Sequence, residues 1–183
     1  MTEKVSGKEW IFLVGLGLII FTGIIWFSLN SNSCKQDLDG LSVFACNPVQ
    51  EFREILSKDS SFDFTSFNSS KFKGVIVQLN LDSGATEGNS VVAAVGAEIV
   101  NSLVSKGRNT TAIGVVDGKV MSYESVPFQQ RQELLGKTAF IISKGECNCL
   151  KTMDGKIYFE GDSEFMMQHL LKLRGIISLV LSG

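Results

Sequence analysis

The longest stretch of the chain without a charged side chain runs from Trp10 to Leu29. A helix that crosses the roughly 30 Å of hydrocarbon in a bilayer needs about 20 predominantly apolar residues, and this stretch has that length. Trp10 and Trp26 lie near its two ends, where indole rings favour the membrane interface. A cleaved signal peptide is the alternative, although its apolar core usually has only about 7–15 residues. We therefore predict one uncleaved transmembrane helix over residues 10–29.

The basic residues that flank this stretch indicate its orientation. Lys4 and Lys8 precede it, whereas Lys35 follows it closely. Because basic residues favour the cytoplasmic side, we expect residues 1–9 to form a cytoplasmic tail. The protein is then a single-pass protein of the cell membrane with a signal-anchor, and its C-terminal domain lies outside the cytoplasm.

All four cysteines of the chain, Cys34, Cys46, Cys147 and Cys149, follow the predicted anchor. An even number of cysteines in an exported domain indicates disulfides, and three pairings are open. Cys34 and Cys46 can close a short loop. Cys147 and Cys149 would point to the same side of a strand, where a bridge between them is strained. A crossed pairing between the two halves of the chain is therefore the alternative.

Metal binding is the alternative role for the four cysteines. Four thiolates suit zinc, but Cys147-Asn148-Cys149 lacks the spacing of a zinc knuckle, so we expect no metal and no cofactor. The absence of a Cys-x-x-Cys pair argues against a thioredoxin-like role.

We also expect no nucleic-acid partner. The formal net charge is -2, and phosphate binding needs a local excess of Lys and Arg.

Residues 30–73 connect the predicted anchor to the main domain. The first part is polar and resembles a juxtamembrane spacer. Asn47 can cap a helix that begins at Pro48, and Gln50 can complete a capping box. This helix is expected to end near Ser57. The following segment is rich in serine and phenylalanine, which predicts irregular structure packed on the domain.

Residues 74–183 show the alternation of strand and helix patterns that builds an α/β domain. Ser90 is expected to cap a helix that Gly107 ends, and Asp162 to cap the last helix. Asp-Gly pairs predict hairpin turns. The expected elements are strand 74–82, helix 90–106, strands 110–116 and 120–123, helix 127–135, strands 138–143, 147–153 and 157–160, and a final helix. The predicted fold class is α/β, with α+β as the alternative: one transmembrane helix followed by a small mixed-sheet domain with packing helices.

One short motif, Leu81-Asp82-Ser83-Gly84-Ala85-Thr86, resembles the active-site turn of retropepsin-type aspartic proteases. The resemblance implies that Asp82 supplies one of two carboxylates that share a proton and activate water. Leu134-Leu135-Gly136 is similar to a second element of that family. The family also has a flap hairpin after the turn, whereas a helical pattern follows here. The alternative interpretation is a polar turn between a strand and a helix.

No set of acids, bases and nucleophiles in the sequence converges on a reaction. His169 is the one histidine of the chain, and a lone histidine on a helix is more often structural than catalytic. We therefore predict a membrane-anchored extracytoplasmic module that binds or assembles with another protein, without catalytic activity. The alternative is a membrane-tethered, dimeric retropepsin-like aspartic peptidase that uses Asp82.

Overall fold

A computed structural model describes the structure of part of the chain. The described residues are Gly15, Gly17, Leu18, 20–22, 34–58, 61–63, 71–121 and 133–182. The chain divides into two compact units, Met1–Lys35 and Gln36–Gly183, each of which is described by itself.

The first unit contains the predicted anchor, most of which lies outside the described residues, as does the tail 1–9. Its described residues are helical, and the Thr22 hydroxyl donates to the Leu18 carbonyl (2.8 Å). Leu18, Ile20 and Phe21 are exposed. Within the described part of the chain, no helix has both the length and the apolar composition that a membrane crossing requires.

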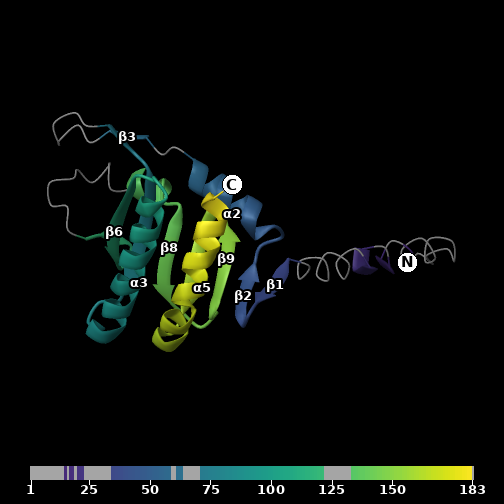
Figure 1. Cartoon of the computed structure of the whole chain (residues 1–183). Coiled ribbons are helices and arrows are strands. Elements are labelled where there is room, and N and C mark those ends of the chain that lie inside the picture. Colours follow the sequence, from purple (N-terminus) through teal and green to yellow (C-terminus); the bar gives the residue numbers. More distant parts are fainter. Residues whose placement is uncertain are drawn as a thin grey trace, which may run out of the picture. The chain divides into compact units, whose positions relative to one another are not determined.

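An eight-stranded sheet with helices packed on it dominates the second unit (Figure 1). The strands of this sheet are β1 (Lys35–Leu38), β2 (Leu41–Phe44), β5 (Val75–Leu81), β6 (Thr110–Val116), β7 (Lys119–Val120), β8 (Phe140–Lys144), β9 (Cys149–Met153) and β10 (Lys156–Gly161). The long helices are α2 (Pro48–Ser57), α3 (Thr86–Ser105) and α5 (Ser163–Leu181). A separate two-stranded ribbon consists of β3 (Ser61–Asp63) and β4 (Lys71–Lys73). The mixed α/β architecture agrees with the predicted fold class.

The sheet order is β1-β2-β9-β10-β8-β5-β6-β7. Strands β5, β6, β8 and β10 are parallel, and β9 runs antiparallel to β10. The chain leaves β5 through α3 to reach β6, and later returns to β8 on the other side of β5. The carboxyl ends of β5 and β8 therefore mark a topological switch point, where α/β sheets usually bind ligands.

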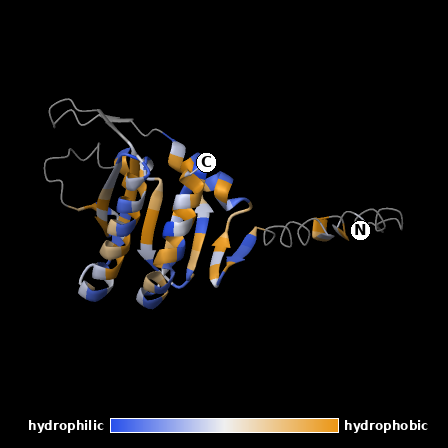
Figure 2. Ribbon diagram, viewed as in Figure 1, coloured by the Kyte–Doolittle hydropathy of each residue, from blue (hydrophilic) through white to orange (hydrophobic). Residues whose placement is uncertain are grey.

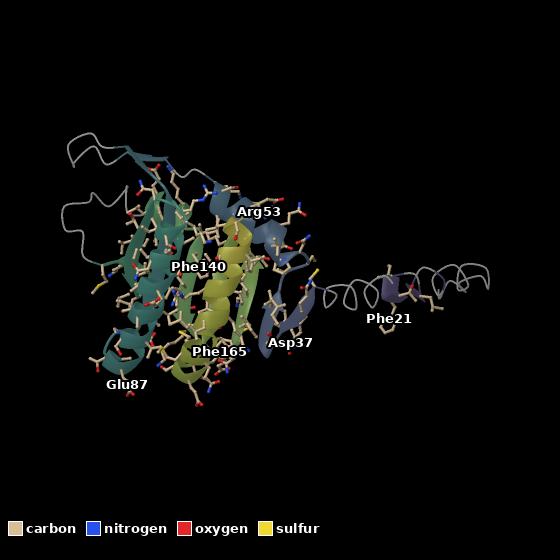
Figure 3. All side chains as sticks on the ribbon, in the orientation of Figure 1. Phe21, Asp37, Arg53, Glu87, Phe140 and Phe165 are labelled. Carbon is tan, nitrogen blue, oxygen red and sulfur yellow. A yellow bond between two sulfur atoms is a disulfide. The ribbon has the colours of Figure 1, made fainter. Side chains whose placement is uncertain are left out.

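The main core lies between one face of the sheet and helices α3 and α5 (Figure 3). Alternate strand residues such as Phe140 point to this face, where they meet the apolar sides of the helices. Figure 2 shows the same division, because α3 and α5 carry both hydrophobic and hydrophilic sides. Helix α2 joins this core, and the Arg53 Nε group donates to the Val180 carbonyl in α5 (3.1 Å).

The opposite face of the sheet, called here the second face, carries a smaller apolar cluster that includes Ile76, Ile113 and Leu134. Residues that pair in register across neighbouring strands project to the same face. The register therefore places four residues of the second face in one row across β5, β8, β10 and β9. This polar row consists of Asn80, Ser143, Glu160 and Cys149.

The stretch expected to be a polar spacer, residues 30–40, contains strand β1, and β2 follows it directly. They are joined at Asp39-Gly40, whose φ values of 52° and 85° suit an Asp-Gly hairpin turn. Leu41 and Val43 are fully buried in the main core. Only alternate residues of β2 face the core, so the hydrophobic signal of this strand was too short to be read from the sequence.

Helix α2 begins as predicted, with the Asn47 side chain accepting from the Gln50 N–H (3.1 Å) and Pro48 in the first turn. The capping box differs from the prediction, because Glu51 rather than Gln50 accepts the Asn47 N–H (3.0 Å). The second carboxylate oxygen of Glu51 accepts the Thr152 hydroxyl (2.6 Å). This contact with β9 explains why Glu51 takes the role.

Helix α3 begins at Thr86, so the prediction that Ser90 caps it was wrong. The Ser90 hydroxyl donates to the Glu87 carbonyl inside the helix (2.6 Å). The amide of Asn89 reaches back to the backbone of Asp82, as described below. At the other end Gly107, with φ of 76°, ends the helix as predicted.

The other local predictions have mixed outcomes. The turns at Asp117-Gly118 and Asp154-Gly155 are confirmed, and so is the cap of α5, since the Asp162 side chain accepts the Phe165 N–H (2.8 Å). The segment expected to be irregular holds the β3–β4 ribbon. Of the predicted helix 127–135, the described residues 133–135 are helical and the rest lies outside the described part.

Candidate functional site

Two loops meet the carboxyl edge of the sheet at the switch point. One follows β5 and contains Asp82, and the other follows β8 and contains Cys147, while Cys149 is the first residue of β9. The side chain of Lys144, the last residue of β8, lies against Gly88 in the first turn of α3. It lies so close that a Cβ atom added at Gly88 would be 2.5 Å from the Lys144 Nζ atom. The two loops therefore belong to neighbouring strands of one edge.

Asp82 is the first residue after β5 and leads directly into α3. The Asn89 Oδ1 atom accepts the Asp82 N–H (2.9 Å), and the Asn89 Nδ2 group donates to the Asp82 carbonyl (2.8 Å). The backbone of the turn is thus fixed, while the Asp82 residue is exposed. The surrounding fold, a parallel strand followed by a long helix, differs from the fold that the retropepsin resemblance implies.

A groove of about 490 Å³ follows β5 along the second face of the sheet. Its lining residues are Gln78, Asn80, Leu81, Asp82, Val115, Asp117, Gly118, Leu135, Ile141 and Lys156. The two carboxylates lie at the carboxyl edge, because Asp82 and Asp117 follow a pair of residues that are in register. Lys156 is the first residue of β10, and the next residue, Ile157, pairs with the first residue of β8. Lys156 therefore lies at the amino ends of these parallel strands, opposite the two carboxylates. The groove therefore has an acidic end and a basic end.

The floor of the groove is held by side-chain hydrogen bonds. The Gln78 Nε2 group donates to the Asn80 Oδ1 atom (2.7 Å), and the Thr138 hydroxyl lies 3.2 Å from the Gln78 Oε1 atom. Thr138 is 3% exposed. Lys156 is tied as well, since its Nζ group donates to the Leu135 carbonyl (3.0 Å). A ligand would meet amides and charges that are already in place.

All four cysteines are disulfide-bonded. Cys147 bridges Cys149 over a Cα–Cα distance of 5.2 Å. Cys34 and Cys46 are disulfide-bonded as well. The prediction of disulfides is confirmed, but the argument against a Cys147–Cys149 bridge was wrong. It assumed an extended strand, whereas Asn148 adopts a φ of 47° and Cys147 lies outside β9. The turn at Asn148 brings the two Cα atoms within the usual range for a disulfide.

The Asn148 side chain locks this turn to the start of α5. Its Oδ1 atom accepts the Asp162 N–H (3.0 Å), and its Nδ2 group donates to the Asp162 Oδ2 atom (3.2 Å). The backbone N–H of Phe165 and the Asn148 amide both lower the pKa of the Asp162 carboxyl. The Gly145 N–H donates to the Gly161 carbonyl (3.2 Å), which holds the same loop from its other end.

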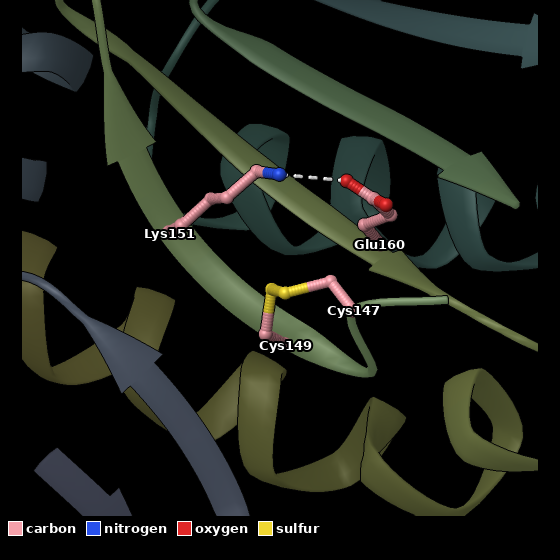
Figure 4. Close-up of polar contacts among 4 residues, drawn as sticks. All are labelled: Cys147, Cys149, Lys151 and Glu160. Carbon is pink, nitrogen blue, oxygen red and sulfur yellow. Dashed lines mark hydrogen bonds and ion pairs between the residues drawn. A yellow bond between two sulfur atoms is a disulfide. The ribbon is translucent and has the colours of Figure 1, made fainter. Parts of the chain in front are cut away.

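A half-buried ion pair lies beside the disulfide, as Figure 4 shows. The Lys151 Nζ group is 2.8 Å from the Glu160 Oε2 atom, and the two side chains are 28% and 23% exposed. Glu160 is the register partner of Cys149, and Lys151 is the next residue of β9 on the same face. Burial raises the pKa of the neighbouring Tyr158 hydroxyl, and Asp154 adds to that effect while Lys151 opposes it.

No pattern in the sequence singles out Asn148, Lys151 or Glu160. Lys151 and Glu160 are common residue types in alternating strands, and only the register of β9 and β10 brings them to Cys149. His169 is structural, because its Nδ1 atom lies 2.9 Å from the Phe165 carbonyl and its ring stacks on Phe165. Among the described residues, no group of three or more His, Cys, Asp and Glu side chains is suited to hold a metal ion.

Comparison of the chain with protein-family models, with curated proteins and with solved structures finds no match.

Proposed function

We propose that this chain is a binding module, held at the cell membrane by residues 10–29, whose domain lies outside the cytoplasm and takes a ligand in the β5 groove. The observation that carries the proposal is the groove itself. It opens on the carboxyl ends of parallel strands, beside a topological switch point, where α/β folds usually bind ligands. Its volume of about 490 Å³ is within the range of small-molecule sites.

The charges of the lining favour a ligand with a cationic group. Asp82 and Asp117 stand together at the carboxyl edge. Lys156, the one cation among the lining residues that the structure describes, is at the other end and already donates to a carbonyl. The amides of Gln78 and Asn80 offer both donors and acceptors between them. The ligand class is therefore a small polar cation or zwitterion, free or presented by a protein side chain.

Two further features support the location. The run from Trp10 to Leu29 has the length and composition of a membrane span. The pairing of all four cysteines suits an oxidising compartment, since disulfides are rare in the cytosol.

The test is the thermal midpoint of the full chain in detergent with arginine, choline or spermidine as probes, and with acetate as the anionic control. A cation present at one hundred times its dissociation constant stabilises by about 2.7 kcal/mol. For a domain of this size we expect a rise of about 5–10 °C. The Asp82→Asn and Asp117→Asn variants should each lose most of that rise.

Asp154→Asn is the matched control for Asp117→Asn. Both residues open an Asp-Gly turn with nearly equal φ values, 52° and 49°, and asparagine tolerates that conformation. Asp154 does not line the groove. The proposal for the groove is wrong if Asp154→Asn also removes the rise in thermal midpoint, or if no cationic probe raises the midpoint of the unmodified chain.

A further inference from the structure

The disulfide between Cys147 and Cys149 has no part in the groove and is a separate chemical feature of the carboxyl edge. We propose that it is a thiol–disulfide exchange site, at which the thiolate of a partner cysteine attacks the Cys147 sulfur and displaces Cys149. The inference goes beyond the proposed binding role and does not depend on it. It rests on the size of the ring, the difference in exposure between the two cysteines, and the groups that surround them.

The ring is too small to explain the bridge by stability. A disulfide stabilises a fold mainly by restricting the unfolded chain, and the effect grows with the length of the closed loop. Cys147 and Cys149 are separated by only two positions, so their bridge restricts very little of the chain. Bridges that are exposed and contribute little to folding are the ones that undergo exchange most readily.

The two sulfurs differ in access. Cys147 is exposed, whereas Cys149 is fully buried in the sheet. An incoming thiolate can therefore reach only the Cys147 sulfur. Attack there forms a bond between the partner sulfur and Cys147 and breaks the bond to Cys149. Cys149 leaves as a thiolate and takes a proton from solvent.

The second half of the reaction regenerates a disulfide. In one route, the Cys149 thiolate attacks the Cys147 sulfur and releases the partner thiolate. In the other, a second partner thiolate attacks the partner sulfur of the mixed disulfide and releases Cys147 as a thiolate. In the latter case the partner leaves as a disulfide and both Cys147 and Cys149 end as thiols. The two electrons pass from the partner thiols to the bridge, and a disulfide of another molecule reoxidises it. No other reactant is needed.

The loop keeps the two cysteines together when the bridge is open. Asn148 holds its turn through two hydrogen bonds to Asp162, which itself caps α5. These contacts do not involve the sulfurs, so they persist in the reduced chain. A short distance between the two thiols favours closure of the mixed disulfide over its release.

The ion pair beside Cys149 suits its role as the leaving group. A buried thiolate is costly unless a cation lies nearby, and Lys151 projects to the same face two residues along β9. Glu160, directly opposite Cys149, holds the Lys151 ammonium in place at 2.8 Å. Lys151 is a positioning residue here, since it acts on the charge of Cys149 and does not react.

The first test uses the unmodified full chain in detergent. It is equilibrated in glutathione buffers of increasing reducing strength, trapped with an alkylating reagent and analysed by mass spectrometry. The Cys147–Cys149 bridge should open at a ratio of reduced to oxidised glutathione at least ten times lower than the disulfide bonding of Cys34 and Cys46, which serves as internal control. Equal resistance of Cys147–Cys149 and of this control would overturn the proposal.

Variants then identify the attacked sulfur. Cys149→Ala should form a mixed disulfide with oxidised glutathione at Cys147, whereas Cys147→Ala should form at least ten times less at Cys149. Equal modification of both variants would contradict the proposed direction of attack. A thermal midpoint for each variant shows that it is folded. A reduced, unfolded cysteine-containing protein replaces glutathione in a second arm, and preferential reaction with one of them assigns the source of the thiolate.

The role of Lys151 has its own readout. Starting from the chain with glutathione on Cys147, the rate at which Cys149 expels it should rise with pH as the Cys149 thiol ionises. Lys151→Met should move this profile to higher pH, and Lys151→Arg should restore it. A profile that is the same in all three chains would remove Lys151 from the mechanism.

Discussion

Asn148 and Asp162 hold each other through two hydrogen bonds, one from the Asp162 N–H to the Asn148 Oδ1 atom (3.0 Å) and one from the Asn148 Nδ2 group to the Asp162 carboxylate (3.2 Å). They join the loop after β8 to the first turn of α5. The two residues are 14 positions apart, so their contact could not be predicted from the sequence.

Asn148→Ala is therefore expected to destabilise the domain by about 1–3 kcal/mol. The variant loses two hydrogen bonds worth about 1 kcal/mol each and places alanine at a positive φ of 47°. Asn148→Gly loses the same bonds but tolerates the φ value, so its loss should be smaller. Urea unfolding followed by circular dichroism measures both. Equal losses would mean that the backbone conformation costs nothing here.

Asp162 makes stability depend on pH. Because hydrogen bonds from the Phe165 N–H and Asn148 lower the pKa of its carboxyl in the folded state, the unfolded state binds the proton more tightly. The stabilisation is then complete above the unfolded pKa of about 3.9 and is lost as pH falls through the lower folded pKa. Asp162→Asn, which keeps the cap, should have a lower urea midpoint than the unmodified chain at pH 6. The gap should shrink towards pH 3, and a gap that stays constant would refute this account.

Two glycines in helices should respond in opposite directions to alanine. A Cβ atom at Gly96 in α3 would overlap the Leu79 side chain of β5, whereas one at Gly175 in α5 meets nothing within 4 Å. Gly175→Ala should stabilise the domain by about 0.5–1 kcal/mol through helix propensity. Gly96→Ala should destabilise it by about 1 kcal/mol, because overpacking outweighs that gain. Thermal or urea unfolding tests the pair, and a stabilised Gly96→Ala would mean that Leu79 has room to move.

The proposed topology can be tested on intact cells with a membrane-impermeant thiol reagent. With the domain outside, the cysteines should be labelled only after an external reductant opens their bridges, and mass spectrometry should find label at Cys34, Cys46, Cys147 and Cys149. If reduction leaves them unlabelled until the membrane is permeabilised, the domain is on the cytoplasmic side and the proposed location is wrong.

The sequence predicted best those elements whose signals are local. Strand β6 matches its predicted bounds, Thr110–Val116, because a β-branched run ends at an Asp-Gly turn. The start of α2 at Pro48 and the cap of α5 at Asp162 were also predicted, since both depend on side chains within three residues of the helix start. Such contacts can be read without knowing the fold.

Features that depend on distant partners were missed. Strand β2 exists because it pairs with β9, and α3 begins early because the Asn89 amide bonds to Asp82 across the turn. The polar row on the second face was invisible for the same reason, as Asn80 and Cys149 share it only through the register of the strands between them. Neither the groove nor the surroundings of the disulfide could be assembled from spacing along the chain.

The pairing of β2 with β9 also sets the order in which the domain can be completed during synthesis. Glu51 and Thr152, which bond across this junction, are 101 positions apart. The N-terminal hairpin and α2 leave the ribosome long before the strand that they need, and β9 is followed by α5, which covers the main core. The hairpin and α2 must therefore wait, without these partners, until almost the whole chain has been made. A chaperone that shields Leu41, Val43 and Phe52 during that interval would be expected to raise the yield of folded protein.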